Sequence, residues 1–415
     1  MRVLHISKYD RKGGASRAAY NSVISQRSAG IDAELLVGRK LSADDFVHSV
    51  RSVSKLPILF RFVGEKSPHT LFGNADVRSL HLFGLHAETI ERVFRPDLVV
   101  LHKVDGIVAV SELEKFTVPV IWRIHDMWPI CGSQHYQADE QVVGPNAPQW
   151  TGNSLQRAID NRVFEYKRRI YDRARQLSFC PPSHWLGECL RQSPIFDRPP
   201  SVEVVPNGID TATFAPVDKS IARQTLGLPA DAKIVLFGAA SGANRKRKGF
   251  DLLIDALNRL DHRTSKRTVL LVFGDKLPEE IDVPNITVSS VGAIRDDEML
   301  AKIYSAADLL VSPSRQENLS LTVLESLACG TPVVAFDIGG MPDMISGGHN
   351  GWLARPFDVD DLHDKIHTAI SLSAEALEPF GLSARQTVMN NFSLQTEAEG
   401  MQRLFRRILD QGQPG

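Results

Sequence analysis

Residues 311–337, with the sequence VSPSRQENLSLTVLESLACGTPVVAFD, contain the alternation of elements on which the fold depends. An apolar strand is expected to end at Ser312, where a polar loop follows. A helix is expected to begin after Ser320, an N-cap residue, because leucine and alanine recur behind it at helical spacing. Gly330 then ends the helix, and the apolar run 333–336 predicts a second strand. This order is typical of a parallel α/β sheet.

The start of the expected helix is suited to bind an anion. Its first N–H groups have no acceptor within the helix, and the helix dipole adds partial positive charge. Glu317 precedes the helix and Glu325 lies inside it, about 12 Å apart if the whole span were helical. That scale suits a nucleotide sugar, with a central diphosphate and hydroxyls at both ends. The alternative is a buried helical turn with two solvated glutamates, which the spacing leaves open.

Two segments predict the openings of two doubly wound halves. Strand Arg2–Ile6 leads to Gly13 and Gly14 and then to an apolar helical pattern. Strand 233–238 leads to a loop in which residues 245–248 read Arg-Lys-Arg-Lys. Four cations between a strand end and a helix start repel one another, and a diphosphate would stabilise them. The alternative is a solvated basic loop.

Three motifs together resemble one enzyme family. They are PSxxExxxxxxxE at residues 313–325, ACGTPVVAFDIGGMPDMI at residues 328–345, and PNGID at residues 206–210. The pattern resembles the retaining GT-B glycosyltransferases of the "group 1" family. The resemblance implies an α/β fold of two Rossmann-like doubly wound domains facing a cleft.

The resemblance also implies a division of the chain. Residues 1–208 would form an acceptor-binding domain and residues 209–390 a nucleotide-sugar-binding domain. Residues 391–415 would form a C-terminal helix that crosses back to the first domain.

In this family the two glutamates contact the donor, which implies that Glu317 meets the sugar and Glu325 the ribose. The lysine directly before a glycine, here Lys248, holds the departing diphosphate together with an arginine. Arg245 and Arg247 both remain candidates for that arginine. The loop from Gly292 to Ile294 is the family's base-recognition region, where contacts are often made through the backbone. The implied donor site comprises Arg245, Arg247, Lys248, Gly292, Glu317, Asn318, Leu319, Ser320, Leu321 and Glu325.

The acceptor side is expected at the end of the strand 118–124. That strand delivers His125 and Asp126 to a carboxyl edge, where ligands of open α/β sheets gather. An imidazole there can donate a hydrogen bond or shuttle a proton. The run HDMWPICGSQHY, residues 125–136, resembles bacterial polysaccharide glycosyltransferases, in which the histidine stands beside the transferred sugar. The expected catalytic residues are His125, Glu317 and Lys248, with Gly13, Gly14 and Asp126 on the acceptor side of the cleft.

Other segments carry weaker expectations. Residues 77–94 are predicted to be helical, residues 41–75 to be irregular, and residues 137–153 to form a loop or flap. Two basic helices, at 155–175 and 395–409, are either solvated faces or contacts with anionic lipid at the inner membrane.

Composition and simple motifs argue against several classes of protein. Lys and Arg number 48 against 49 Asp and Glu, so the charge balance does not suggest a nucleic-acid partner. The four cysteines form no CxxC pair, which fits a reducing cytosol. The chain opens directly with a strand and shows no signal peptide, so a cytoplasmic location is expected, with contact at the cytoplasmic face of the membrane as the alternative. No acidic metal motif stands at a strand end, so no metal and no cofactor are expected.

The expected function is transfer of a sugar, with retention, from a nucleoside-diphosphate sugar to a glycan or lipid-linked acceptor. Bacterial exopolysaccharide or lipopolysaccharide synthesis is the implied setting. Two alternatives remain open at this point. One is a sugar-nucleotide epimerase or a phosphorylase on the same fold, and the other is a non-catalytic protein that binds nucleotide sugars.

Overall fold

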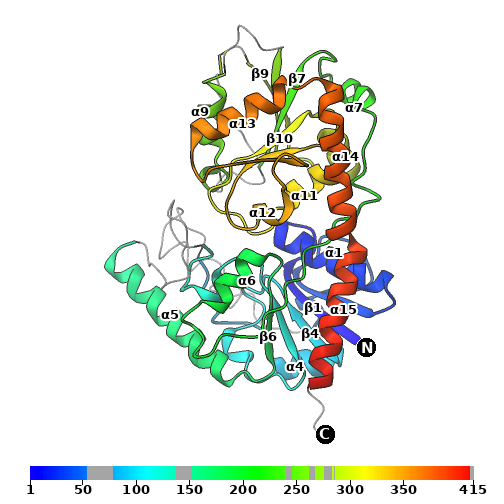
Figure 1. Cartoon of the computed structure of the whole chain (residues 1–415). Helices are drawn as coiled ribbons and strands as arrows, with labels where there is room; N and C mark the ends of the chain where they lie inside the picture. Colours follow the sequence, from blue (N-terminus) through cyan, green and yellow to red (C-terminus); the bar gives the residue numbers. More distant parts are fainter. Residues whose placement is uncertain are drawn as a thin grey trace. The chain divides into compact units, whose positions relative to one another are not determined.

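The structure is a computed structural model that describes residues 1–53, 78–136, 152–239, 245–260, 267–274, 283–284 and 286–411. The chain forms two compact units, Met1–Gly208 together with Leu394–Gly415, and Ile209–Ser393. It therefore passes between the units twice. In the rainbow colouring of Figure 1 the red C-terminal helix belongs to the same unit as the blue N-terminus.

The first unit is built on a parallel sheet with the order β3-β2-β1-β4-β5-β6. This is the strand order of a Rossmann-like domain, whose order reverses between β1 and β4. Its strands are β1 (Arg2–Tyr9), β2 (Asp32–Arg39), β3 (Val47–Ser49), β4 (Leu98–Leu101), β5 (Val120–Arg123) and β6 (Leu177–Cys180). Its described helices are α1 (Gly14–Ser28), α2 (Val50–Val53), α4 (Ala87–Phe94), α5 (Ser154–Arg173), α6 (His184–Arg191) and α15 (Leu394–Gln411), with short 3-10 turns η1 (Val110–Glu112) and η2 (Trp128–Ile130).

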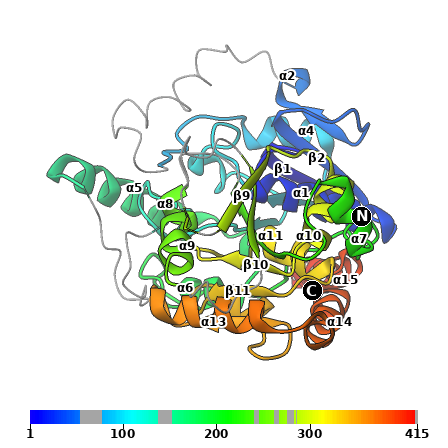
Figure 2. The same cartoon turned by 90° about the horizontal axis from the view of Figure 1, so that it is seen from above.

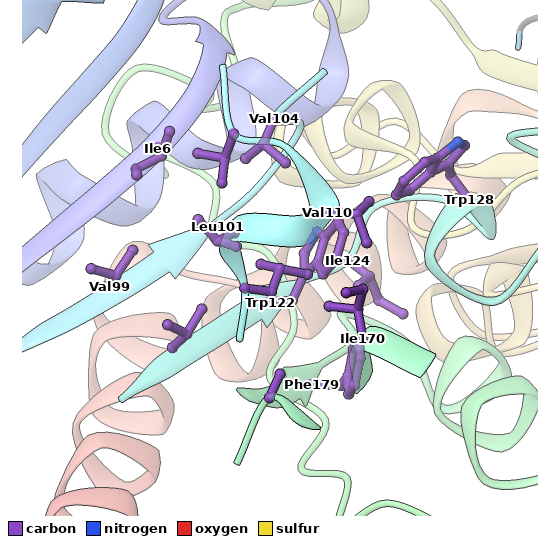
Figure 3. Packing of buried hydrophobic residues seen from close by; sticks show 14 of the residues in the cluster. Ile6, Val99, Leu101, Val104, Val110, Trp122, Ile124, Trp128, Ile170 and Phe179 are labelled. Atoms are coloured by element: carbon purple, nitrogen blue, oxygen red, sulfur yellow. The ribbon is translucent and has the colours of Figure 1, made fainter. Parts of the chain in front are cut away.

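The two faces of this sheet bury different clusters, because side chains alternate along each strand. On one face Leu101 and Trp122 pack with Ile170 of α5 and Phe179 of β6, as Figure 3 shows. On the other face lie Val3, Leu98, Val100, Ile121, Cys180, Val205 and the α15 residues Met401, Leu404 and Phe405. The C-terminal helix thus supplies part of the core of the first unit.

The second unit repeats this topology. Its sheet has the order β12-β11-β10-β7-β8-β9, which read from β9 is again the Rossmann-like order, with the reversal between β7 and β10. The strands are β7 (Lys233–Ala239), β8 (Thr268–Gly274), β9 (Ile286–Gly292), β10 (Leu309–Ser312), β11 (Val333–Phe336) and β12 (Gly351–Ala354). The described helices are α7 (Lys219–Thr225), α8 (Arg245–Lys248), α9 (Phe250–Leu257), α10 (Asp297–Ala306), α11 (Leu321–Ala328), α12 (Met341–Met344), α13 (Val359–Ser371) and α14 (Ala374–Asn391).

Helices cover both faces of the second sheet. In Figure 2, α13 lies on one side of β10 and β11 and α11 lies on the other. Val333 and Ala335 of β11 pack on the α11 side, whereas Val334 and Phe336 pack on the α13 side. Both faces are therefore apolar, which explains the unbroken hydrophobic runs in the sequence. The two parallel sheets with flanking helices confirm the predicted α/β class with two Rossmann-like doubly wound domains.

Some local predictions were wrong. Residues 78–86 are not helical. Arg78 pairs with Gln134 and Leu85 with Val108 as isolated bridges, so α4 begins only at Ala87. Long-range pairing therefore overrides the helical pattern there. Within the predicted irregular segment 41–75, β3 and α2 are regular, and the rest beyond residue 53 lies outside the described residues, as does most of 137–153. Among the described helices, none is long and apolar enough to cross a bilayer.

Candidate functional site

Two loops of the second unit meet at the reversal of its strand order. β7 and β10 are paired neighbours there, with Leu236 opposite Leu310. The segment after β7 contains the helical turn α8, and the segment after β10 contains Glu317. Because both strands run in the same direction, both segments leave the same edge of the sheet. Ligands of open α/β sheets bind outside the carboxyl ends of the strands at such a reversal.

Backbone contacts fasten the two loops to each other. Gly249 has φ +70°, and a Cβ atom there would stand 1.8 Å from the Pro313 carbonyl oxygen, so only glycine fits. The Arg315 backbone N–H donates to the Arg247 carbonyl at 2.7 Å. The Arg247 guanidinium donates to the Gln316 carbonyl at 2.7 Å. The position of α8 is therefore fixed directly against the loop that carries the first glutamate.

Lys248 and Glu317 form an ion pair, and both side chains are largely buried. A second cation stands close, since Arg247 Nη1 lies 3.7 Å from Glu317 Oε2. Burial alone would raise the pKa of Glu317, but the Lys248 and Arg247 charges outweigh it, so the pKa is lowered. Burial lowers the pKa of Lys248, and Glu317 opposes that shift. The site thus holds two cations against one carboxylate in a partly desolvated setting.

The two candidate arginines differ in what the structure shows. Arg247 is placed at Glu317, whereas for Arg245 only the backbone is described, as the first residue of the α8 turn. The cations were predicted on a loop, but residues 245–248 form a single helical turn. Lys246 points to solvent on this turn, so the cations of α8 do not share one face.

The second glutamate is buried at a tyrosine. Glu325 lies in α11 and is 5% exposed, and its Oε2 accepts a hydrogen bond from the Tyr304 hydroxyl at 2.7 Å. Tyr304 is held in turn, because the Thr331 hydroxyl donates to its carbonyl at 2.7 Å. The alternative of two solvated glutamates is therefore wrong, since both carboxylates are buried and bonded.

The first turn of α11 follows Glu317 directly. Ser320 occupies the N-cap position as predicted, but its side chain makes no capping hydrogen bond within the described chain. Asn318, Leu319 and Leu321 around it are buried. The N–H groups of this turn lie at the positive end of the helix dipole, which supports the prediction of an anion site there.

Glycines also lie in the loops after β9 and β11 of the second unit. Gly292 ends β9 with φ +69°, and no described atom lies within 4 Å of a Cβ built there. The Gly340 N–H donates to the Glu317 carbonyl at 3.4 Å, so the glycine pair before α12 borders the glutamate loop. The backbone is accessible at Gly292, as expected for a region that binds through main-chain atoms.

In the first unit, His125 ends a row of three histidines. His125 Nε2 lies 2.9 Å from His102 Nδ1, and His102 Nε2 lies 2.9 Å from His5 Nδ1. These residues come from β1 and from the positions just after β4 and β5, three adjacent strands of the sheet. Burial is the main cause that lowers the pKa of His125, to about 3, so this imidazole is neutral.

Asp126 has a structural environment. Its Oδ2 lies 2.6 Å from His135 Nδ1, and its Oδ1 accepts the Trp128 N–H at 3.0 Å. Burial raises the pKa of Asp126, but the His135 charge and other partners bring it down to about 2. The carboxylate thus stabilises the turn after β5.

The glycine pair of the first unit opens α1. Gly13 is the N-cap with φ +83°, and Gly14 is the first helical residue. No described atom lies within 4 Å of a Cβ built at either position, so the backbone is approachable. The loop lies beyond β1, on the carboxyl edge where the strand order reverses.

The basic side predicted for helix α5 is smaller than expected. Lys167 is buried, and its Nζ donates to the carbonyls of Trp128 and of Gly132, the latter at 2.9 Å. Arg168 pairs with Asp197 at 2.7 Å. Lys167 therefore belongs to the core, and it lies neither on a solvated face nor on a lipid-facing one.

Several residues around the sites were not found from the sequence. Tyr304 and Arg315 carry no motif, and their partners are 21 and 64 residues away in the chain. His5 and His102 had a usable signal, because each is a histidine inside or just after an apolar strand. Their alignment across the sheet becomes visible only from the strand order.

The match to a known protein family lies in the second unit. The family model described as glycosyl transferases group 1 matches residues 232–371. A D-inositol 3-phosphate glycosyltransferase of Saccharomonospora viridis is 29% identical over 51% of this chain and 51% of its own. The same enzyme of Streptomyces bingchenggensis is 35% identical over 41% of this chain and 40% of its own. The chain thus spans about half, or less, of the length of these curated relatives.

Solved structures match over the whole length. Sucrose-phosphate synthase from Thermosynechococcus elongatus has a TM-score of 0.71 at 20% identity, covering 99% of this chain and 100% of that one. The Anabaena protein Alr3699/HepE, solved with UDP and glucose, has a TM-score of 0.66 at 16% identity, covering 98% and 99%. At such identities the likeness concerns the fold, which is GT-B in these neighbours.

Proposed function

We propose that the chain is a retaining glycosyltransferase, starting from the match of residues 232–371 to the family model described as glycosyl transferases group 1. Its donor is a nucleoside-diphosphate sugar and its acceptor a glycan or a lipid-linked glycan. The observation that carries the proposal is the group formed by Lys248, Arg247 and Glu317 beside the first turn of α11. The cations and the helix end together suit a diphosphate.

The donor binds to the second unit by its charged centre. Lys248 and Arg247 contact the diphosphate, with the N–H groups of the first turn of α11 beside them. Glu317 contacts hydroxyls of the sugar and Glu325 those of the ribose. Because Tyr304 fixes one oxygen of Glu325, the other oxygen is oriented in advance. When the donor binds, Lys248 keeps part of its contact with Glu317 and also contacts the phosphate, so neither charged side chain is left without a partner.

Bond breaking places negative charge on the departing nucleoside diphosphate. Two fixed cations and a helix N-terminus stabilise that charge in a partly desolvated site. We therefore propose that transfer needs no metal ion and no cofactor. A test with EDTA, against added Mg²⁺, measures this directly.

Retention without a carboxylate nucleophile is the proposed stereochemical course. Retaining glycosidases use a second carboxylate as nucleophile. In the first unit, the carboxylate next to His125 is Asp126, whose two oxygens are taken up by His135 and the Trp128 N–H. A same-face displacement is therefore the proposed mechanism, and His125 serves the acceptor half of the reaction. NMR of the anomeric proton in the product decides between retention and inversion.

We propose bacterial exopolysaccharide or lipopolysaccharide synthesis in the cytoplasm as the setting. All four cysteines are described, buried and without a disulfide, which suits a reducing compartment. A lipid-linked acceptor would bring the enzyme to the inner membrane. Co-sedimentation with anionic vesicles, with and without such an acceptor, measures that contact.

The decisive experiment is a thermal-shift panel of UDP-, GDP-, ADP- and dTDP-sugars, followed by turnover with the sugar that binds. A bound donor stabilises the native state according to its concentration over Kd. We expect one donor to raise the Tm, and Lys248→Met and Glu317→Gln to lose the shift and most turnover. Lys246→Met, an exposed cation of the same turn, is the matched control and should behave like wild type.

Two results would contradict the proposal. Wild-type turnover in both Lys248→Met and Glu317→Gln would remove the assigned donor site. Tight donor binding without hydrolysis or transfer to any glycan would point to a non-catalytic binding protein.

A further inference from the structure

The hydrogen-bonded row of buried histidines continues beyond His5 through two polar side chains of α1. Its far end is Gln26 of α1, whose Oε1 lies 2.9 Å from His5 Nε2. Gln26 Nε2 donates to the Ser22 hydroxyl oxygen at 3.2 Å. The Gln26 amide is therefore placed with its nitrogen toward Ser22 and its oxygen toward His5.

This orientation of the Gln26 amide sets the direction of the first hydrogen bonds. The amide nitrogen donates to the Ser22 hydroxyl oxygen, and the amide oxygen, which can only accept, faces His5. His5 Nε2 must therefore carry the proton of this imidazole.

The hydrogen bonds between the imidazoles have the same order of donor and acceptor. A neutral imidazole has one N–H donor and one acceptor nitrogen. With its proton on Nε2, His5 accepts at Nδ1 from His102 Nε2. His102 then accepts at Nδ1 from His125 Nε2. The proton of His125 is thus on Nε2, and Nδ1 is its basic nitrogen.

The surroundings keep all three rings neutral. Burial lowers the pKa of His5 to about 4 and that of His102 well below its usual value, as it does for His125. The guanidinium of Arg123 lowers the pKa of each ring further. An additional proton on any of the three rings is therefore disfavoured, and the tautomers stay ordered.

We propose that His5 and His102, anchored by Gln26 and Ser22, lock His125 in the Nε2–H tautomer, so that its Nδ1 accepts a hydrogen bond from a substrate hydroxyl. The row consists of positioning residues, and His125 is the residue that meets the substrate. The role in transfer rests on the proposed function, whereas the tautomer does not. The ligand group that His125 selects is therefore a hydrogen-bond donor, such as a sugar hydroxyl, and not a carbonyl or phosphate oxygen, which can only accept.

The first test observes the wild-type protein and needs no substrate. Long-range ¹H–¹⁵N spectra of the full chain labelled with ¹⁵N-histidine distinguish the two neutral tautomers, with single substitutions for assignment. We expect His5, His102 and His125 all to be protonated at Nε2 at neutral pH. A His125 signal with its proton on Nδ1 would overturn the proposal, whatever the protein catalyses.

The second test breaks the row. His102→Phe removes the partner of His125, so we expect mixed tautomers at His125 and a kcat lowered at least about tenfold. The KM for the donor should stay near wild type, since the row positions His125 and is not assigned to donor binding. An exposed histidine of the same unit, His86, gives the control His86→Gln, which should change neither quantity. A wild-type kcat and an unchanged His125 signal in His102→Phe would contradict the proposal.

The third test replaces Gln26, which accepts the hydrogen bond from His5, by a residue that can still accept and by one that cannot. Gln26→Glu supplies a carboxylate that accepts from His5, so the His125 tautomer should be retained. Gln26→Met supplies no acceptor, so the tautomers should mix and kcat should fall. Equal spectra in the two variants would refute the anchoring role. If no donor supports transfer, the proposed function fails, but an ordered tautomer that is lost in Gln26→Met still establishes the lock.

Discussion

At the scale of single residues, the chain uses buried charges in two different ways. Lys248 and Glu317 form a pair with a second cation nearby, and we assign this group to substrate. Lys167 is a lone buried cation whose partners are backbone carbonyls and the Trp128 ring, 3.9 Å from its Nζ. Each arrangement leaves a different pH signature in the free energy of unfolding.

Glu317 should make the protein sensitive to acid. Its pKa is lowered in the folded state, because the nearby cations outweigh the effect of burial. Its contribution to stability is therefore complete above the unfolded pKa of about 4.5 and is lost as the pH falls through the folded value. In urea unfolding at pH 5 and pH 3, wild type should lose more stability than Glu317→Gln. Equal losses would contradict this account, and exposed Glu399→Gln is the control.

Lys167 should act at the other end of the pH range. Burial lowers its pKa from 10.5 to about 7, so between these values the unfolded state holds more protons than the folded state. Stability contributed by this site therefore rises with pH across that window. We expect wild type to gain stability relative to Lys167→Met between pH 7 and about pH 9.5. A difference between the two proteins that does not change with pH would show that Lys167 is not buried as a titrating amine.

At the scale of elements, side-chain caps distinguish ordinary helix N-termini from the N-terminus of α11, the candidate anion site. Ser373 caps α14 through a hydrogen bond from Ala376 N–H at 3.2 Å. Ser320, at the same position of α11, makes no such bond in the described chain. The start of α11 is thus left to backbone donors, which is the arrangement expected where a ligand supplies the acceptor.

The caps give a matched pair of variants. Ser373→Ala should lower the free energy of unfolding by about 1 kcal/mol, because a cap is lost. Ser320→Ala should change it by less than about 0.5 kcal/mol, since no capping bond is removed. The measurement is urea unfolding of both variants beside wild type. A larger loss for Ser320→Ala than for Ser373→Ala would show that Ser320 caps α11 in solution.

Elements with continuous apolar runs and turn residues could be predicted from the sequence. β1, β10, β11 and α11 all lie where the pattern placed them, because burial on both faces requires such runs. The extended segment before α4 could not be predicted, since its conformation depends on pairing with Gln134 and Val108. The Lys248–Glu317 contact was accessible only through the family resemblance, because 69 residues separate the partners. Tyr304 and the histidine row depend on strand order, which local patterns do not encode.

At the scale of the whole molecule, the C-terminal helix is a structural part of the first unit. Glu397 of α15 pairs with the fully buried Arg123 at 2.8 Å and accepts the Gly208 N–H at 2.9 Å. Burial raises the pKa of Glu397, and Arg123 opposes this shift. Arg123 also donates to the Pro206 carbonyl at 2.9 Å. One buried ion pair therefore holds α15 and the outgoing chain on the same sheet.

Breaking this pair should destabilise one unit selectively. Glu397→Ala leaves Arg123 buried without its carboxylate, and the expected loss is about 3 kcal/mol. In differential scanning calorimetry, the transition of the first unit should move down while that of the second unit stays in place. Glu399→Ala, an exposed position on the same helix, serves as the control. A downward shift of both transitions together would show that the units unfold as one.

The separation of the first unit into two stretches of sequence has a consequence for synthesis. When Gly208 leaves the ribosome, the sheet is complete, but the helix that covers one of its faces has not yet been made. All of Ile209–Ser393 is translated first, which takes roughly 10–40 s at bacterial rates. During that interval a nascent chain exposes to chaperones an uncovered apolar face and an internal arginine that lacks its carboxylate partner, so the unit whose synthesis begins first is completed last.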